Sequence, residues 1–504
     1  MAALILLAAF NNRILKIWTL LLVSLGFIAS YYVARLNVGI DMSVIRSILS
    51  TDQEEVVEFI DPLSLLLLVA VVGTATAALA ITSIVPRHQL TGNIVLAPRP
   101  IGVLSLTGAL ILLVVSSHHA FGQVDATQFF KTGLARYSPL NLLVYGAKYG
   151  RHAWRTRQVI VQDISPLFSL DDKPRGGEVV VIVLGESARS ANFQLAGYDR
   201  PTNPRLSRES GLIFFKDVTA CRTHTAEAIP CLLTRFGNAK LSFPITEVSL
   251  VSIFKRLGFQ TKWYSMQATL DYDICQEADI CLASVGTNGT QASKGALGGN
   301  VDEKLLPLLK KSLAERNQGR LLVVLHLLGS HAVYSERYPR AWAQYQPECT
   351  GAAYTCPALD VVNSYDNSIR YTDYVVSEAI EMLRAENAIL FFTSDHGESL
   401  GELGVYGHGW PTSVAPKEQM KVPLAIWASP TFIANRKDEW AGLRASALKA
   451  AASKSVTHDY FFHTVLGCSG VSSTLLRSDL NLCADDADRR VSLLGNRNRS
   501  ANPN

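Results

Sequence analysis

The pattern of apolar positions divides this chain into two unlike parts. Leu, Ile, Val and Ala dominate up to about residue 120, whereas beyond about residue 170 short apolar runs alternate with polar segments. A membrane-spanning helix needs about 20 mostly apolar residues, and residues 17–33 with their flanks, 62–85 and 101–120 meet this condition. The pattern therefore predicts a helical membrane anchor over residues 1–120, followed by a globular domain.

The charges between these apolar segments predict their orientation. Arg13 and Lys16 precede the first segment, Arg87 and Arg99 lie between the second and third, and the loop between the first and second is acidic. Short basic loops of membrane proteins stay in the cytoplasm, so the third segment should exit outward. We expect a multi-pass protein whose residues beyond 120 lie outside the cytoplasm. An inward-running helix should precede Arg13, but residues 1–10 are too short to span, so we expect the first helix to be missing or truncated.

Residues 121–175 connect the predicted anchor to the globular part. They combine aromatic residues and leucines with scattered Lys and Arg, which is typical of helices that lie in the membrane interface. A plain linker is the alternative, and residues 151–162 have the composition of a polar bridge. We place the globular domain at residues 176–490 and a polar tail at 491–504.

Two apolar runs of the globular part are followed by residues of types that commonly bind metals. Residues 388–392 lead into Asp395 and His396, and residues 179–184 lead into Glu186. Such runs predict buried strands of a mostly parallel sheet, and open α/β sheets build their ligand sites where strands end. An adjacent carboxylate and imidazole suit a divalent metal, above all zinc. The globular part is therefore a candidate enzyme with an α/β fold.

The cysteines place this domain in an oxidising compartment. Close sequential pairing of an even number of cysteines suggests local disulfides, and the absence of a C-x2-C spacing argues against zinc fingers. The net charge of only +4 gives no case for a nucleic-acid partner. All eight cysteines lie in the second part of the chain, as Cys221 with Cys231, Cys275 with Cys281, Cys349 with Cys356, and Cys468 with Cys483.

The first cysteine pair flanks a threonine-rich turn that contains Thr225 and is expected to open a helix. A disulfide would hold this turn rigid, as the placement of a nucleophile requires. A threonine hydroxyl is a poor nucleophile unless it is deprotonated, which a divalent metal and a helix N-terminus both favour. Threonine at such a position is more often a helix cap. Thr225 is therefore a candidate nucleophile only because of the metal-binding residues expected at the strand ends.

Taken together, these segments resemble the membrane-anchored phosphoethanolamine transferases that modify lipid A, the polymyxin-resistance enzymes of the alkaline phosphatase superfamily. The resemblance covers most of the chain, including the acidic loop of the anchor. The matching stretches are Gly-Glu-Ser-Ala-Arg at 185–189, the cysteine-flanked turn at 221–231, Ser-Tyr-Asp-Asn at 364–367, Ser-Asp-His-Gly-Glu-Ser-Leu-Gly-Glu at 394–402, Gly-Val-Tyr-Gly-His-Gly at 404–409 and Ala-Pro-Lys-Glu-Gln at 415–419.

The resemblance implies a catalytic domain that is an α/β/α sandwich of the alkaline phosphatase and sulfatase type. It also implies a second pair of residues, His331 and His408, that contacts the phosphoryl group or a further zinc. Glu398 is expected to contact substrate, to support these residues or to cap a following helix. For the lone histidines His224, His326 and His458 we expect structural roles. The implied zinc ligands are Glu186, Thr225, Asp395 and His396, with Thr225 as the nucleophile.

The implied reaction is a two-step transfer at the bacterial inner membrane, with the catalytic domain in the periplasm. Phosphatidylethanolamine donates its headgroup to Thr225 and leaves as diacylglycerol, and a lipid A phosphate then takes the group, which reduces susceptibility to polymyxin. We expect a monomer. Two departures bear on the acceptor. Ala332-Val333 stands where the family usually has Gly-Pro, and residues 263–268 lack a lysine-containing stretch common among lipid A enzymes.

The sequence offers three alternatives to phosphoethanolamine transfer to lipid A. Phosphoethanolamine or phosphoglycerol could pass to another envelope glycan, either a core sugar or a periplasmic glucan, although the cysteines around Thr225 weigh against phosphoglycerol. A sulfatase would need a Cys or Ser nucleophile in a C/S-x-P-x-R context, which is absent. An inactive membrane-anchored binding protein should have lost one of the four implied ligands, and all four are present.

Overall fold

The computed structural model divides the chain into two compact units, residues 1–45 with 59–152 and residues 46–58 with 153–504. The predicted third span, the segment 121–137 and the tail 491–504 lie outside the described residues, as do residues 1–10 and most of the acidic loop. The structure describes residues 12–36, 39–40, 42, 44–45, 62–81, 138–156, 160–170, 176–237, 245–268, 274–285, 301–410, 412, 414–436 and 445–484.

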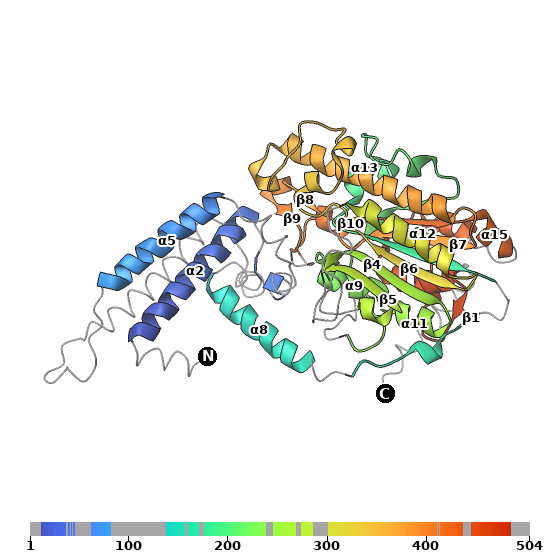
Figure 1. Ribbon diagram of the computed structural model, residues 1–504, viewed down its shortest axis with the longest axis horizontal. Coiled ribbons are helices and arrows are strands. Elements are labelled where there is room, and N and C mark those ends of the chain that lie inside the picture. Colours follow the sequence, from blue (N-terminus) through green and yellow to red (C-terminus); the bar gives the residue numbers. More distant parts are fainter. Residues whose placement is uncertain are drawn as a thin grey trace. The chain divides into compact units, whose positions relative to one another are not determined.

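Helices α2 (Asn12–Leu36) and α5 (Pro62–Ile81) contact each other in the first unit (Figure 1). Within the described residues, only Lys16–Ala34 of α2 is long and apolar enough to cross a membrane, and Ser64–Ala80 of α5 is a shorter apolar helix. Their sequences explain the helices, because straight-chain and small apolar residues dominate both. Helix α8 (Leu140–Thr156) then covers part of the segment predicted to lie in the membrane interface.

The second unit is built on an eight-stranded sheet whose strand order is β11-β3-β10-β7-β2-β6-β4-β5. All neighbours pair in parallel except β10, which runs antiparallel to both β3 and β7. The sheet is therefore mostly parallel, as predicted. The strands are β2 (Val179–Gly185), β3 (Ile213–Thr219), β4 (Gln260–Ala268), β5 (Ile280–Val285), β6 (Leu321–His326), β7 (Ala388–Ser394), β10 (Lys421–Ala428) and β11 (Val456–Thr457).

Helices cover both faces of this sheet. Alternate residues of β2 enter two different cores, because successive side chains of a strand point to opposite faces. Val180, Ile182 and Leu184 pack with residues of α9, α11 and α18, whereas Val179 and Val181 pack with residues of α12 and α13. Figure 1 shows α12 and α13 on one side of the sheet and α9 and α11 on the other. The helices are α9 (Thr225–Leu233), α11 (Leu250–Arg256), α12 (Leu305–Glu315), α13 (Ala358–Leu383), α14 (Lys417–Met420), α15 (Pro430–Asn435), α17 (Ala445–Ala451) and α18 (Asp459–Cys468).

The globular unit contains contacts that begin before the predicted boundary at residue 176. Strand β1 (Ser169–Leu170) pairs with β12 (Val471–Ser472), and Ile164 and Phe168 are buried in the core of the sheet's α9 face. A second two-stranded ribbon, β8 (Ser399–Leu400) with β9 (Tyr406–Gly407), lies between two of the candidate site residues in the sequence. The sequence pattern did not reveal these short pairings, because two-residue strands have no detectable periodicity.

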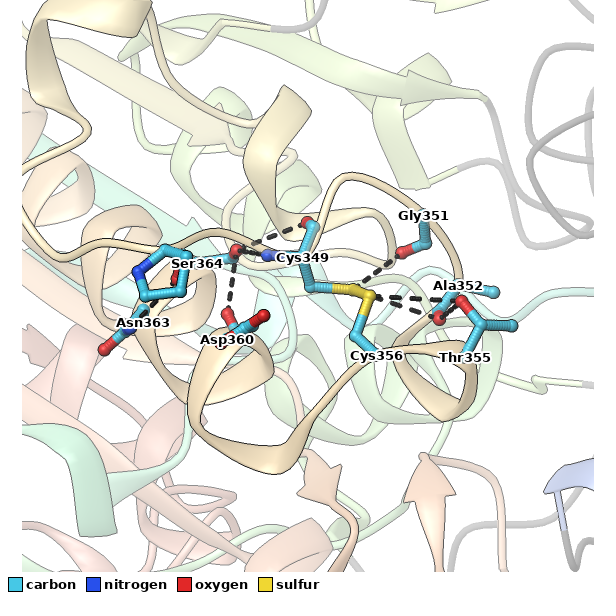
Figure 2. Close-up of a disulfide and its surroundings, with 9 residues drawn as sticks. Cys349, Gly351, Ala352, Thr355, Cys356, Asp360, Asn363 and Ser364 are labelled. Carbon is cyan, nitrogen blue, oxygen red and sulfur yellow. Dashed lines mark hydrogen bonds between the residues drawn. A yellow bond between two sulfur atoms is a disulfide. The ribbon is translucent and has the colours of Figure 1, made fainter.

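All four predicted disulfides are present: Cys221–Cys231, Cys275–Cys281, Cys349–Cys356 and Cys468–Cys483. Figure 2 shows Cys349–Cys356, which closes the loop ahead of α13. The backbone N–H of Cys349 donates to Ser364 Oγ at 2.7 Å, and this hydroxyl lies within hydrogen-bonding distance of the carbonyls of Asp360 and Cys349. The disulfide and Ser364 together tie this loop to the first turns of α13.

Candidate active site

The parallel register of the sheet brings the predicted site residues together. Strands β2 and β7 are neighbours, and Gly185 pairs with Ser394 at their ends. The residues that follow, Glu186 and Asp395, are therefore delivered side by side at the carboxyl edge of the sheet. Asp395 N–H donates to the carbonyl of Gly185 at 3.1 Å, which extends the pairing one step beyond the strands.

Thr225 meets these residues from the N-terminus of α9, of which it is the first residue. Its Oγ1 donates to Glu186 Oε2 at 2.9 Å and lies 3.2 Å from His396 Nε2. The same Nε2 atom lies 3.2 Å from Glu186 Oε1 and 3.2 Å from Asp395 Oδ2. Glu186, Asp395 and His396 are fully buried, whereas Thr225 is partly exposed. The four residues thus form one cluster whose hydroxyl remains accessible.

Backbone contacts orient the imidazole and the carboxylate of this cluster. His396 Nδ1 lies 2.9 Å from the carbonyl of Gly397, so the neutral imidazole carries its proton on Nδ1 and then presents the lone pair of Nε2 to the cluster. Asp395 Oδ1 accepts from the backbone N–H groups of His396 at 2.7 Å and Ser187 at 3.2 Å. Asp395 Oδ2 is buried and accepts no hydrogen bond from the described residues. A lone-pair nitrogen and an unused carboxylate oxygen therefore converge at one place.

The charges in this cluster favour a bound cation. Burial, and then the negative charge of Glu186, raise the pKa of Asp395 well above its usual range. Burial also opposes ionisation of Glu186, but the nearby imidazoles, that of His396 foremost, outweigh it and hold its pKa well below the usual value. Two buried carboxylates this close cannot both ionise without a compensating positive charge. Carboxylate oxygens with an imidazole nitrogen are donors that zinc accepts.

His408 lies close to this cluster. One ligand atom each of Glu186, His396 and His408 lies within 4.8 Å of the others, a spacing that could hold a metal ion. The rings of His396 and His408 are 4.1 Å apart at their centroids, and the ring of His331 lies 6.3 Å from that of His408. The structure therefore brings both histidines of the implied second pair to the cluster.

Glu398 is buried and contacts two side chains, one of them a candidate site residue. Its carboxylate is 1% exposed, with Oε2 2.9 Å from His408 Nδ1 and Oε1 accepting from Tyr334 Oη at 2.8 Å. The segment after it is strand β8, so it caps no helix. Of the three expected roles, the geometry agrees with support of His408.

The lone histidines are buried within the domain. His326 Nδ1 lies 3.1 Å from Ser265 Oγ, and the backbone N–H of Cys221 donates to His458 Nδ1 at 3.4 Å. Burial lowers the pKa of His326 to about 4 and that of His458 to about 3, so both are neutral. The carbonyl of His224 accepts from Ala228 N–H at 2.8 Å in the first turn of α9. The ring of His224 lies 6.1 Å from that of His408, beside the cluster. The structural roles of the three histidines therefore stay a prediction.

Sequence reasoning missed Gln267, which lies near the end of β4. Its Nε2 donates to Glu186 Oε2 at 2.9 Å and to the carbonyl of Leu327 at 2.8 Å. The signal that could have found it is the strand order, because β4 is the second strand from β2 in the sheet and its end follows the same rule that singled out Glu186. The residue lies in the very segment noted only for its missing lysine.

A loop after β6 carries His331 and also holds Glu186. Gly329 has φ +56°, and a side chain there would collide with the backbone of Glu186, so only glycine permits the approach. The N–H of Ser330 donates to the carbonyl of Glu186 at 2.9 Å. Behind the loop, the buried carboxylate of Asp302 accepts from the N–H groups of Leu328 and Gly329 at 2.7 and 2.9 Å.

Comparison with known proteins decides the family of this site. The Sulfatase family profile matches residues 178–471, and the profile described as phosphoethanolamine transferase EptA/EptB matches residues 1–126. A Kdo(2)-lipid A phosphoethanolamine 7''-transferase of Escherichia coli strain K12 is 31% identical over 491 residues, covering 93% of this chain and 84% of that protein. The chain belongs to the phosphoethanolamine transferases.

Other relatives of this phosphoethanolamine transferase agree with that assignment. Phosphatidylethanolamine transferase Mcr-1 of Escherichia coli is 28% identical over 434 residues, covering 82% of this chain and 78% of that protein. The integral membrane lipooligosaccharide phosphoethanolamine transferase A of Neisseria meningitidis superposes with a TM-score of 0.79 at 25% identity, covering 93% of this chain and 87% of that one. The expected fold, a helical anchor with an alkaline phosphatase-like domain, is confirmed, and the chain is an enzyme of this family.

Proposed function

We propose that this enzyme transfers phosphoethanolamine from phosphatidylethanolamine to lipid A through a covalent intermediate on Thr225. The observation that carries the proposal is the contact of Thr225 Oγ1 with both Glu186 Oε2 and His396 Nε2, at 2.9 and 3.2 Å. A partly exposed hydroxyl at a helix N-terminus, beside a buried acceptor, is the arrangement that an oxygen nucleophile needs. The proposal is also supported by two of the relatives reported above, a phosphatidylethanolamine transferase and a Kdo(2)-lipid A phosphoethanolamine 7''-transferase.

Zinc is the metal that the donor set supports best. Glu186, Thr225, Asp395 and His396 would hold it, as the unused Asp395 Oδ2 and the Nε2 lone pair of His396 suggest. When bound, the ion supplies Lewis acidity that favours the ionised threonine and offsets phosphoryl charge. The ring of His331 lies 6.3 Å from that of His408, which has a ligand atom within 4.8 Å of Glu186 and His396, and both histidines would contact the phosphoryl group.

The side chains of the site have distinct roles in the two steps of the proposed reaction. Thr225 Oγ1 attacks the phosphorus of phosphatidylethanolamine while its proton passes to Glu186 Oε2. The Oγ1–P bond forms, the P–O bond to glycerol breaks, and diacylglycerol leaves with a proton supplied from the side of His331 and His408. In the second step a lipid A phosphate oxygen attacks the phosphorus and gives its proton to the side of His331 and His408, which restores the proton lost to diacylglycerol. The Oγ1–P bond breaks, and Glu186 returns the proton to Thr225.

The setting of the reaction follows from the same assignment. We propose a multi-pass inner-membrane anchor that holds the catalytic domain, residues 176–490, in the periplasm as a monomer. The four disulfides of that domain support an oxidising compartment. Modification of lipid A should add a positive charge at the surface and so reduce susceptibility to polymyxin.

Mass spectrometry of lipid A from a polymyxin-sensitive host that expresses the chain tests this proposal. We expect an added phosphoethanolamine mass in cells with the wild-type chain, its loss with Thr225→Ala, and its retention with Thr355→Ala, an exposed threonine used as the matched control. Modification that persists in Thr225→Ala would exclude the nucleophile. Unmodified lipid A despite normal membrane insertion would exclude the acceptor.

A second acceptor is favoured by one observation. Two relatives named Kdo(2)-lipid A phosphoethanolamine 7''-transferase are 30% and 31% identical over 93% of this chain, whereas proteins named EptA from Salmonella typhimurium and Escherichia coli strain K12 are 28% and 27% identical. Because the identity is slightly higher to the relatives whose names include Kdo(2)-lipid A, a core sugar is the second candidate for the acceptor. Fragmentation of the modified lipopolysaccharide distinguishes the two, because the added mass stays either with lipid A or with the sugar.

A further inference from the structure

The proposed reaction leaves the buried side chain of Tyr334, the partner of Glu398, without a function. Tyr334, in the 3₁₀ turn Tyr334–Glu336, and Glu398 are 3% and 1% exposed, and neither is adjacent to Thr225 in the contacts of the cluster. Tyr334 Oη donates to Glu398 Oε1 at 2.8 Å, and Glu398 Oε2 lies 2.9 Å from His408 Nδ1. A continuous chain of hydrogen bonds thus runs from a buried phenol to a histidine that faces the nucleophile.

This chain limits how His408 can turn. The side chain of His408 keeps 24% of its surface exposed, so packing alone does not hold the ring. A carboxylate that accepts from Tyr334 through Oε1 presents Oε2 to Nδ1–H in a fixed direction, and Nε2 of the ring then faces the cluster. The 4.1 Å separation of the His396 and His408 rings depends on this orientation.

Tyr334 is itself held in place by the fold. Its ring packs edge-on against Tyr365 at 5.1 Å between centroids. Tyr365 Oη donates to the carbonyl of Ser187 at 2.6 Å and accepts from the N–H of Arg189 at 2.9 Å. Because Ser187 follows Glu186, the aromatic pair connects the position of His408 to the turn that carries Glu186.

We propose that Tyr334 is a positioning residue for the transfer reaction, acting through Glu398 to hold His408 against the transferring phosphoryl group. The inference rests on the proposed function of the site. It assigns Tyr334 and Glu398 no contact with substrate. Loss of the tyrosine hydroxyl should therefore slow the chemical step and leave donor binding unchanged.

The test uses the full chain in detergent with a fluorescent phosphatidylethanolamine as donor. Tyr334→Phe removes only the hydroxyl and keeps the ring that packs on Tyr365, and we expect kcat to fall roughly tenfold with KM unchanged. Glu398→Gln is the second variant, because it replaces one of the two carboxylate oxygens with an NH2 group, which cannot accept from Tyr334 Oη or from His408 Nδ1–H. Tyr338→Phe is the matched control, since Tyr338 Oη donates to Glu348 and this pair makes no contact with His408 among the described hydrogen bonds.

A double-mutant cycle separates positioning from general damage. If Tyr334 acts through His408, then Tyr334→Phe should have almost no further effect in a His408→Ala background. Equal losses in both backgrounds, or a Tyr334→Phe enzyme as fast as the wild type, would overturn the inference. A wild-type chain that forms no adduct on Thr225, measured by intact mass spectrometry, would instead count against the proposed function itself.

Discussion

The environment of Glu186 shows how a single amide can control a buried carboxylate. Glu186 Oε2 is the acceptor for Thr225 Oγ1, and Gln267 Nε2 donates to the same oxygen. The amide also donates to the carbonyl of Leu327, so both of its protons are used and its direction is fixed. Gln267 therefore determines which way the carboxylate faces when Thr225 gives up its proton.

Gln267→Leu should slow the formation of the Thr225 adduct. The substitution keeps the volume but removes the donor to the carbonyl of Leu327 and leaves Glu186 Oε2 with Thr225 Oγ1 as its donor. We expect a rate roughly tenfold lower, the cost of about one lost hydrogen bond to a charged group. Rapid-quench mass spectrometry of the full chain with phosphatidylethanolamine measures it. Gln344→Leu, at an exposed glutamine, is the control. Equal rates in the two variants would contradict the assigned contact.

At the scale of elements, the ribbon between Glu398 and His408 carries a conformational cost. Leu403, in the 3₁₀ turn Glu402–Gly404, has φ +54° and ψ +24° and is 96% exposed. A left-handed backbone is unfavourable for leucine and better tolerated by asparagine. The residue gains no burial in return within its unit.

Leu403→Asn should therefore stabilise the protein. We expect the free energy of unfolding to rise by about 0.5–1 kcal/mol, seen as an increase of about 1–2 °C in the midpoint of thermal unfolding. Leu359→Asn is the control, because Leu359 is also exposed but lies in the regular backbone of α13. An equal or smaller midpoint for Leu403→Asn than for this control would show that the left-handed turn costs nothing.

The disulfides offer a comparison between two similar loops. Cys221–Cys231 and Cys349–Cys356 close loops with sequence separations of 10 and 7. Removing either by a double Cys→Ser change should cost about 2–3 kcal/mol of stability. Only the first flanks Thr225, so only its removal should also slow adduct formation in protein that remains folded. Equal rates in the two double variants would mean that the disulfide does not position the nucleophile.

At the scale of the whole molecule, the sequence predicted the sheet and the cluster because both follow from short-range patterns. The apolar runs before Glu186 and Asp395 identified two neighbouring strands, and the paired cysteines identified all four disulfides. Asp395 and His396 were recognisable because residue type and strand-end position coincide. Thr225, the first residue of α9, was recognisable only from the cysteines that flank its turn and from the family resemblance.

The supporting residues could not be predicted in the same way. Gln267, Tyr334 and Asp302 contribute through hydrogen bonds to partners 26 to 81 residues away in the sequence, and neither their type nor their local pattern marks them. The β8–β9 ribbon and the early contacts of Ile164 and Phe168 depend on tertiary packing of segments too short for a periodic signal. Such features become visible only when the strand order is known.

Buried titratable groups predict that the domain loses stability in acid. Burial lowers the pKa of His326 and His463 to about 4 and that of His458 to about 3, so they stay neutral in the fold while the unfolded chain binds protons below about pH 6.5. The stability that these neutral histidines contribute to the fold is complete above about pH 6.5 and is lost as the pH falls. Burial raises the pKa of Asp302 and Asp373 to about 6, which works in the opposite direction.

The histidines should outweigh the carboxyls. By linkage, a change from about pH 7 to about pH 5 lowers the free energy of unfolding by about 2 kcal/mol for each histidine and raises it by about 1 kcal/mol for each aspartate. His463→Gln tests this away from the site, because a glutamine oxygen can replace Nδ1 as acceptor for the N–H of Arg477. With chelator present, so that metal release makes no contribution, the variant should unfold near the wild-type temperature at pH 7.5 and above it at pH 5. The same acid loss in both proteins would show that His463 titrates normally in the fold.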